Sequence, residues 1–359
     1  MCKVNGQMIS IINDIIYTHN LESEKYKEVE WKEVFKSAEK KNLLPIIFKE
    51  VSNSEIIDII DKETISEFKN KSATIEKENK KNLKKYMLVV NELKKTKIKF
   101  ILTGSLISRE LYLSPETISI DNIDILVSEN DLDNVDNAFK SLGYVKFPKE
   151  ANKKDIIYVN KNISVRVRWT LINDSFIAGK KLFFEEELLK EAREIEIENE
   201  KILATSLEDS LITLCLDMAE QVYYDELDLR EVLDLVLLVV KYESVVDWKS
   251  FLNKSKKCGI YRFIIAIFTI GNKLFNMPIP TLINKQEKIE DKYIEVLIDE
   301  LTNEFVDSND NDYTSDKVKI NILNKTINKI KEGFKKLISN KGNNKNENLR
   351  DELLRELGL

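Results

Sequence analysis

Histidine and cysteine are scarce in this chain of 359 residues, and their scarcity limits the chemistry it can perform. The single histidine, His19, stands in the polar stretch "YTHNLESE", where a surface position is the best interpretation. Catalytic Ser-His-Asp and Cys-His arrangements are therefore disfavoured. Cys2, Cys215 and Cys258 lie far apart and form no Cys-x-x-Cys pair, so no Cys/His zinc cluster is predicted. Cys215 and Cys258 stand in apolar runs, which indicates reduced residues of the core.

Long apolar runs and an excess of positive charge are also missing. No run reaches the roughly 18 residues of a membrane span, and the opening "MCKVNGQMISIINDIIY" lacks the pattern of a signal peptide. We therefore expect a soluble, cytoplasmic protein. The formal net charge of -6 argues against a dedicated nucleic-acid-binding protein. Lysine-rich stretches at 77–99 and 317–341 leave a local nucleic-acid role open, although a solvated helix face is the better interpretation of the first.

The apolar pattern divides the chain into four regions. Residues 1–97 and 173–306 show mainly helical spacing, as in "WKEVFKSAEKKNLLPIIFKEV" and "SLEDSLITLCLDMAEQVYY". Between them, residues 98–172 alternate short β-rich runs, such as "KFILTGS", "IDILVS" and "ISVRVRW", with helical segments. Residues 307–359 contain a polar linker, a basic amphipathic helix and a tail. The predicted fold class is α+β and mostly helical, with a small mixed sheet between flanking helical regions.

The stretch "FILTGSLISRELYLSPETISIDNIDILVSENDLD", residues 100–133, combines features of a phosphoryl-transfer site. Two-metal enzymes need several carboxylates that converge on Mg²⁺, and acids at positions i and i+2 of one strand share a face. A glycine after the preceding strand lets backbone amides approach a phosphate near a helix N-terminus. Gly104, Ser105 and Asp124 stand in this order, but Asn122 stands where the other acid of the pair is expected.

Residues 100–127 resemble the bacterial uncharacterised nucleotidyltransferase family, a branch of the polymerase-β-like nucleotidyltransferase superfamily. The resemblance extends over roughly residues 30–265, from "WKEVFKSAEKKNLLPIIFKEV" to "VDWKSFLNKSKKCGIYRF", and the order of the segments carries it more than any single motif. It implies a mixed sheet of the nucleotidyltransferase type, with Mg²⁺ as the cofactor of an active member.

Carried over position by position, the resemblance is incomplete in the phosphate turn and the acidic strand. Gly104 and Ser105 match the turn, although Thr103 replaces a lysine that is often seen before the glycine. Asp124 matches the second acid of the Asp-x-Asp pair, whereas the first acid falls on Asn122.

The resemblance also changes character in the later strand and in the C-terminal helices. The third acid of the family falls on Arg166, and a histidine two residues later falls on Arg168; Asp217 replaces a common histidine, while Arg230 and Asp234 match a typical arginine and aspartate. One acid, one amide and one guanidinium in place of three acids make the site three charge units more positive. Mg²⁺ should therefore bind poorly, whereas the arginines could bind a phosphate or carboxylate without metal.

Asp121 is a candidate replacement for the missing acid. It precedes Asp124 by three residues, so a regular strand would point it to the opposite face, and a bulge or an early strand start would be needed to bring it round. Each feature also has an ordinary structural interpretation when taken alone. Gly104 and Ser105 form a strand-to-helix turn, Asp124 is a polar strand residue, and the two arginines cover an edge strand.

Two functions from different classes follow from this pattern. We favour a catalytically impaired nucleotidyltransferase-fold protein that binds a nucleotide, another anion, or a protein or peptide partner. The alternative is an active Mg²⁺-dependent nucleotidyltransferase that moves NMP from an NTP to a small molecule, peptide or protein, with Asp124 and Asp121 as catalytic residues and Asp124 as the metal ligand. A purely structural role of the α/β unit in a helical scaffold is a weaker third interpretation. The expected nucleotide-binding residues are Gly104, Ser105, Asn122, Arg166 and Arg168.

Overall fold

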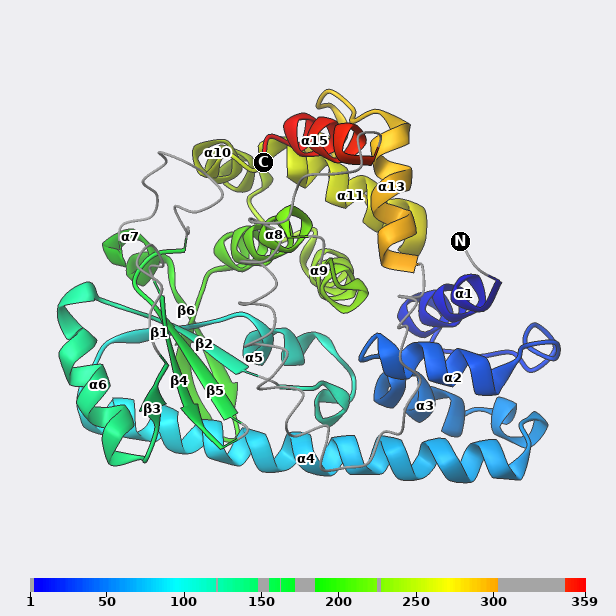
Figure 1. Ribbon diagram of the computed structural model, residues 1–359, viewed down its shortest axis with the longest axis horizontal. Coiled ribbons are helices and arrows are strands. Elements are labelled where there is room, and N and C mark those ends of the chain that lie inside the picture. The colour runs from blue at the N-terminus through cyan, green and yellow to red at the C-terminus, as the bar shows by residue number, and fades with distance from the viewer. Residues whose placement is uncertain are drawn as a thin grey trace.

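The computed structural model describes residues 3–120, 122–147, 155–161, 163–171, 185–224, 227–302 and 346–359. Asp121 and the predicted basic helix at 317–341 lie outside the described residues. One mixed sheet, helices on both of its faces and a layer of helices beside it make up the fold (Figure 1). The predicted α+β, mostly helical fold class is confirmed, and the division of the chain into four regions stays a prediction.

The N-terminal layer consists of short helices followed by one long helix. Trp31 and Phe35 lie on the buried side of the second helix, as their spacing predicts. Pro45 stands in the first turn of the third helix, where a missing amide hydrogen costs nothing. The Asp61 side chain caps the long helix by accepting a hydrogen bond from the Thr64 amide at 2.8 Å. The segments are α1 (Lys3–Tyr17), α2 (Trp31–Lys40), α3 (Leu44–Ser52), η1 (Glu55–Ile59) and α4 (Lys62–Lys95).

Seven strands form the sheet in the order β3-β4-β5-β2-β1-β7-β6. The central strand β2 pairs antiparallel with β1 and parallel with β5, and β1 pairs parallel with β7. Side chains on β2 therefore have neighbours on both β1 and β5. The bounds are β1 (Phe100–Thr103), β2 (Asn122–Val127), β3 (Val145–Lys146), β4 (Asp155–Asn160), β5 (Ile163–Arg168), β6 (Arg193–Ile197) and β7 (Glu200–Ala204).

The two faces of β2 belong to different cores, because side chains alternate along a strand. Ile123 and Ile125 are buried in the core that also contains side chains of α4 and of α6 (Leu132–Ser141). Leu126 is buried in the other core, which contains side chains of α8 (Leu207–Tyr223). Asp124 has the same parity as Leu126 and therefore points toward the α8 side of the sheet.

Short helical segments connect the strands, and capping residues mark where they begin and end. The Ser128 hydroxyl caps the segment after β2 by accepting a hydrogen bond from the Asn130 amide at 3.3 Å. Gly143, with φ of +76°, ends α6 in the left-handed region. The segments are α5 (Ser105–Ser108), η2 (Arg109–Leu111), η3 (Pro115–Thr117), η4 (Glu129–Asp131) and α7 (Glu185–Glu191).

The hairpin β6–β7 departs from the sequence interpretation, which treats residues 173–306 as a helical region. Residues 193–204 instead form the last two strands of the sheet. The alternation in "REIEI" buries Ile195 and exposes the glutamates, as in a half-buried strand. Glu198 and Asn199 have φ values of +51° and +63°, which suit a two-residue hairpin turn. Pairing of β7 with β1 outweighs the helical preference of the glutamates here.

Helices complete the described chain after the hairpin. The Ser206 hydroxyl accepts a hydrogen bond from the Asp209 amide at 3.1 Å and caps the beginning of α8. Gly259, with φ of +79°, separates α10 (Trp248–Cys258) from α11 (Tyr261–Phe275). Besides α8, α10 and α11, these helices are α9 (Leu229–Tyr242), α12 (Thr281–Asn284), α13 (Asp291–Thr302) and α15 (Asn346–Leu357).

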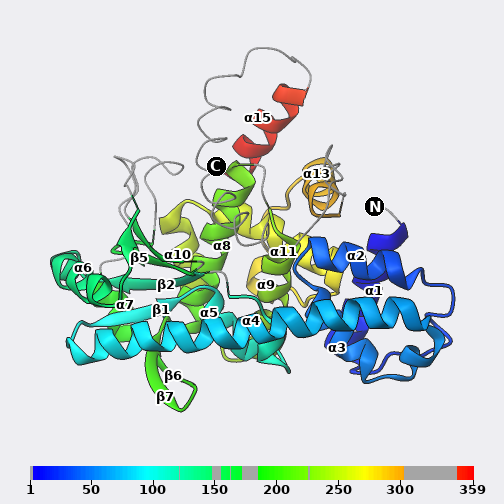
Figure 2. The same ribbon diagram turned by 60° about the horizontal axis from the view of Figure 1, so that its bottom comes forward.

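The long helix α4 belongs to both cores and runs beneath the sheet and the N-terminal helices (Figures 1 and 2). Phe68, near its beginning, is buried with the N-terminal and C-terminal helices. Tyr86, Val90 and Leu93, near its end, are buried against the sheet. In the part of the chain that the structure describes, no helix has both the length and the apolar character needed to cross a membrane.

Candidate functional site

Asp124 lies in the middle of the sheet, between side chains of two neighbouring strands. Its register partners are Thr103 at the end of β1 and Arg166 on β5. The Asp124 side chain is only 5 % exposed. A carboxylate buried this deeply needs hydrogen-bond donors or a positive charge nearby, because burial without them is costly.

The Arg166 guanidinium satisfies the Asp124 carboxylate from the neighbouring strand. Its Nε atom donates to Asp124 Oδ1, and its Nη2 atom donates to Asp124 Oδ2 at 2.9 Å, so both carboxylate oxygens are engaged. Burial is the largest single influence and would raise the pKa of Asp124, but the charge of Arg166, its hydrogen bonds and the charge of Arg168 together outweigh burial, and the net pKa is lowered. Burial would likewise lower the pKa of Arg166, but the nearby carboxylates raise it well above its usual value. The pair is therefore fully ionised.

A second arginine extends the ion pair into a network with α8. Arg168 Nη2 donates to Asp217 Oδ1 at 2.7 Å, and Asp217 Oδ2 lies 3.7 Å from Arg166 Nη2. The Arg168 side chain is 7 % exposed, whereas the Arg166 side chain is 22 % exposed. Asp124, Asp217, Arg166 and Arg168 thus form a charge-balanced network that joins β2, β5 and α8. We refer to these four residues as the arginine–aspartate network.

The glycine turn packs against the Asp124 carboxylate. Gly104 has φ of +71° and ψ of -147°, a region of the backbone map that is essentially restricted to glycine. A Cβ atom added there would lie 2.7 Å from Asp124 Oδ2. The Ser105 hydroxyl donates to the Asn122 carbonyl oxygen at 3.1 Å and ties the turn to the start of β2. The turn therefore has a local structural role, in addition to any role in phosphate binding.

The predicted site residues come together, with one exception that cannot be placed. Asn122 begins β2 and is half-buried, and it shares the face of Asp124 by strand parity. Gly104, Ser105, Arg166 and Arg168 surround the same part of the sheet, as the contacts above describe. Asp121 lies outside the described residues, so its predicted catalytic role stays untested. The sequence did not reveal that Asp217 would hold both arginines.

The donor set around Asp124 does not fit a Mg²⁺ ion. Mg²⁺ takes oxygen ligands, usually from carboxylates, in an octahedral arrangement. Here the Arg166 guanidinium holds both Asp124 oxygens, and Asn122 offers an uncharged amide. Arg166 also occupies the register position beside Asp124, where the resemblance implies a third acid. Among the residues that the structure describes, no group of three or more His, Cys, Asp or Glu side chains is arranged to hold a metal ion. We therefore derive no reaction step through a metal.

Helix α9 adds a second buried polar group close to the network. The Tyr112 hydroxyl donates to Asp234 Oδ1 at 2.5 Å, and Arg230 Nη2 lies 3.6 Å from Asp234 Oδ2. Arg230 also donates to the Ser119 carbonyl oxygen at 3.3 Å. Burial raises the pKa of both Tyr112 and Asp234. The matched residues Arg230 and Asp234 thus hold the segment between β1 and β2 against α9, and Tyr112 is a member that the sequence did not indicate.

Glu231 is a further polar residue near the arginine–aspartate network, and the sequence did not indicate its role. The residue as a whole is half-buried, but its Oε2 atom is fully buried without a hydrogen-bond partner, and Oε1 accepts from Gln221 Nε2 at 2.6 Å. Burial is the main cause that raises the pKa of Glu231 to about 8, and repulsion by Asp217, Asp228 and Asp234 adds to it. The carboxyl is thus largely protonated at neutral pH in the folded protein.

We expect the Glu231→Gln variant to change how stability depends on pH. Between the ordinary carboxyl pKa of 4.5 and the folded-state value of about 8, the folded protein binds a proton that the unfolded chain has released. The free energy of unfolding therefore falls as pH rises through this window and levels off above it. Glutamine mimics the protonated form, so the variant should gain up to about 5 kcal/mol at alkaline pH, at about 1.4 kcal/mol per pKa unit, and little at pH near 4.5.

Urea denaturation over a pH series measures this effect. Glu243, which is exposed just after α9, provides the matched control, because Glu243→Gln removes a carboxylate that is not buried. The expectation fails if the Glu231→Gln and wild-type curves stay parallel from acid to alkaline pH.

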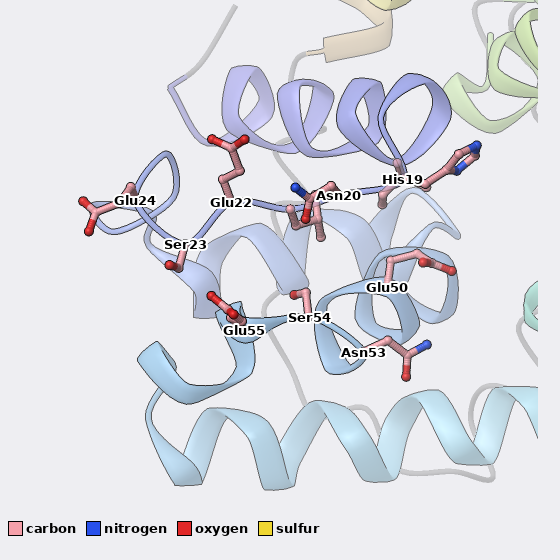
Figure 3. A pocket seen from close by; sticks show the side chains of 11 residues that line it. His19, Asn20, Glu22, Ser23, Glu24, Glu50, Asn53, Ser54 and Glu55 are labelled. Atoms are coloured by element: carbon pink, nitrogen blue, oxygen red, sulfur yellow. The ribbon is translucent and has the colours of Figure 1, made fainter.

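A separate pocket of about 610 Å³ lies at the other end of the molecule, in the N-terminal layer (Figure 3). His19, Glu22, Glu50 and Glu55 are among its lining residues, which come from the segment after α1 and from the end of α3 and beyond. None of the predicted site residues lines it. The pocket is therefore distinct from the arginine–aspartate network.

The fold and the arrangement around Asp124 define the class of protein. A mixed sheet with a glycine turn after one strand and an acid on the antiparallel neighbour is the framework of a nucleotidyltransferase. The chain belongs to the uncharacterised nucleotidyltransferase family, whose model matches residues 27–276. Comparison with curated proteins gives no match.

Three solved structures show distant similarity. The antibiotic-resistance factor ANT(2'')-Ia has a TM-score of 0.37 and 10% identity, with 52% of this chain and 95% of that chain covered. The lincosamide antibiotic adenylyltransferase LnuA, bound to lincomycin, has a TM-score of 0.32 and 15% identity, with coverage of 43% and 94%. An antigenic nucleotidyltransferase-like protein from Paracoccidioides brasiliensis has a TM-score of 0.34 and 15% identity, with coverage of 54% and 93%. Similarities this distant imply no shared substrate.

Proposed function

We propose that this protein is a catalytically impaired nucleotidyltransferase-fold protein that acts by binding, without Mg²⁺-dependent nucleotidyl transfer. The observation that carries the proposal is the two-point ion pair between Arg166 and the buried Asp124 carboxylate. The guanidinium neutralises the acid that resembles the family's metal ligand. A metal ion would have to displace a bidentate, buried partner, and such pairs are among the strong charge-assisted interactions of proteins.

The charge balance around the site supports the same conclusion. Two aspartates and two arginines cancel within the network, so these four side chains together carry no net negative charge to attract a divalent cation. Removal of either partner would leave an uncompensated buried charge, which favours the pair as it stands. The alternative, an active Mg²⁺-dependent transferase, requires Asp124 to exchange Arg166 for metal during turnover.

A nucleotide phosphate is the ligand that we propose for the exposed part of the network. A guanidinium has five N–H donors, and Asp124 uses two of those of Arg166. The Arg166 side chain is 22 % exposed, and the Gly104 turn lies across the same carboxylate. An anion such as a phosphate can approach arginine without a metal. A protein or peptide partner with an acidic side chain would use the same chemistry.

The proposal can be tested by placing acids at positions 122 and 166, where the resemblance implies them. We expect wild-type protein to bind a fluorescent ATP analogue equally well with Mg²⁺ or with EDTA and to turn over no NTP. The double substitution Asn122→Asp with Arg166→Glu rebuilds three acids around the turn, and calorimetry should then detect Mg²⁺ binding that the wild type lacks.

Arg166→Glu alone is the matched control, because it removes the guanidinium without the second strand acid and should bind Mg²⁺ more weakly than the double variant. Thermal melting verifies that each variant folds. Mg²⁺-dependent NTP turnover by the wild type, lost in Asp124→Ala, would overturn the proposal in favour of the active enzyme.

A further inference from the structure

A strip of lysines follows the outer face of α4, opposite to its buried side. Positions 77, 80, 81, 84 and 85 fall within one side of the helix at 3.6 residues per turn, and the buried Leu83, Tyr86 and Val90 fall on the other. Four of the five lysines are exposed and the last is half-buried. We call them the α4 lysine strip: Lys77, Lys80, Lys81, Lys84 and Lys85.

The sheet contributes one more lysine, Lys161, beside the strip. Lys161 follows β4 and precedes β5. It is exposed and has a φ of +57°. Lys161 and Lys81 both lie close enough to Lys85 to repel its charge. Burial, and then this repulsion, lower the pKa of Lys85, while Glu78 at the margin of the strip partly offsets the effect. The strip and Lys161 therefore form one positive surface.

Among the described residues, acids offset the charge of the strip only in part: Glu116 acts on Lys80, and Glu78 acts on Lys85. Other lysines of α4 have ion-pair partners: Lys71 pairs with Glu39 and Glu67, and Lys94 pairs with Glu200. Within the described ranges, no ion pair involves the strip lysines or Lys161, in contrast to these neighbours. Figure 2 brings α4 to the front, where no described element covers its outer side.

We propose that the α4 lysine strip and Lys161 bind the phosphodiester backbone of a double-stranded nucleic acid without sequence preference. The net charge of -6 argues against this role for the chain as a whole. Screening limits the reach of distant charges to about 8–10 Å at physiological ionic strength, so the local surface decides the interaction. Contacts from lysines to phosphates position a protein on a duplex but carry no sequence information.

The helical geometry suits a backbone contact. From Lys77 to Lys85 the strip rises about 12 Å along a straight helix, a length over which one strand presents several phosphates. An acidic membrane surface is a poorer match, because membrane-surface helices also bury a broad apolar face. Here Leu88, at 61 % exposure, is the one large apolar side chain exposed on the described length of α4.

Fluorescence anisotropy with labelled duplexes tests the proposal on the full chain. Duplex DNA and duplex RNA of about 20 base pairs should both bind, with a logarithmic salt slope of about -4 if four to five phosphates are neutralised. The triple substitution of Lys81, Lys85 and Lys161 by Glu should reduce affinity at least tenfold and make the slope shallower by about three. Binding of only one duplex type would identify which source of backbone the strip accepts.

Lys249, Lys285 and Lys288 provide the control, because they are exposed, lie away from α4 and change the net charge equally when replaced by Glu. The lysine-rich stretch 317–341 is intact in both variants, so binding through it would appear equally in both. Equal loss in strip and control variants, unchanged binding by the strip variant, or attachment to phosphatidylserine vesicles without duplex binding would each overturn the proposal. Circular dichroism verifies that both variants fold.

Discussion

Replacement of Asp124 by alanine is expected to destabilise the protein by about 3 kcal/mol, because it leaves the half-buried Arg166 without its main partner. Asp217 lies 3.7 Å from Arg166 and is already held by Arg168, so it compensates only in part. The direction of the change in stability distinguishes an ion pair from a cluster of metal-binding acids. In a cluster of unpaired metal-binding acids, loss of one acid relieves repulsion and stabilises the metal-free protein. Urea denaturation in EDTA measures the change directly.

The double substitution Asp124→Leu with Arg166→Met provides the control for this experiment. It removes both charges and fills much of the same volume, and buried ion pairs replaced in this way often cost little or nothing. We therefore expect the double variant to be much more stable than Asp124→Ala. A gain in stability for Asp124→Ala would contradict the ion pair and support an acid cluster that awaits a metal.

Substitution of Gly104 by alanine is the second large effect that we expect. Two costs combine: the φ of +71° with ψ of -147° is strained for any residue with a side chain, and the new Cβ would lie 2.7 Å from Asp124 Oδ2. Strain of this kind alone costs about 1–3 kcal/mol, and displacement of the carboxylate also weakens its bond with Arg166. A total loss of about 3 kcal/mol or more is the expected result in urea denaturation.

Gly143→Ala is the matched control for this turn. Gly143 also has a positive φ, of +76°, but an added Cβ would meet only Asn160 Nδ2, at 3.6 Å. This variant should lose about 1 kcal/mol, as is usual for glycine in such a position. The difference between the two variants combines the contact with Asp124 and the greater backbone strain at Gly104. If both lose the same amount, the turn does not depend on that carboxylate.

Local signals in the sequence predicted much of the framework. The order of strand, glycine turn, short helix and acidic strand in residues 100–127 indicated the fold together with the similar segments over roughly residues 30–265. Helix boundaries at Ser128, Gly143, Ser206 and Gly259 follow from capping chemistry that involves only a few neighbouring residues. Substitution of the metal-binding acids was also visible without coordinates.

Contacts between distant segments could not be predicted in the same way. The register that sets Arg166 beside Asp124 joins residues 42 apart in the chain, and the bond between Tyr112 and Asp234 spans 122 residues. The raised pKa of Glu231 arises from burial and from acids on two helices. Nothing in the sequence around these residues signals such pairings, because their energy comes from tertiary packing.

Helix α4 has a mechanical consequence for the whole molecule. Its 34 residues extend over about 50 Å as one rigid rod, with one end anchored among the helical layers and the other against the sheet. Neither half of the protein can swing or unravel on its own without bending this rod or stripping apolar side chains from it. A load applied to the exposed side of α4 would therefore be shared by both ends. We therefore expect the two cores to move together under such a load, because α4 packs in both of them.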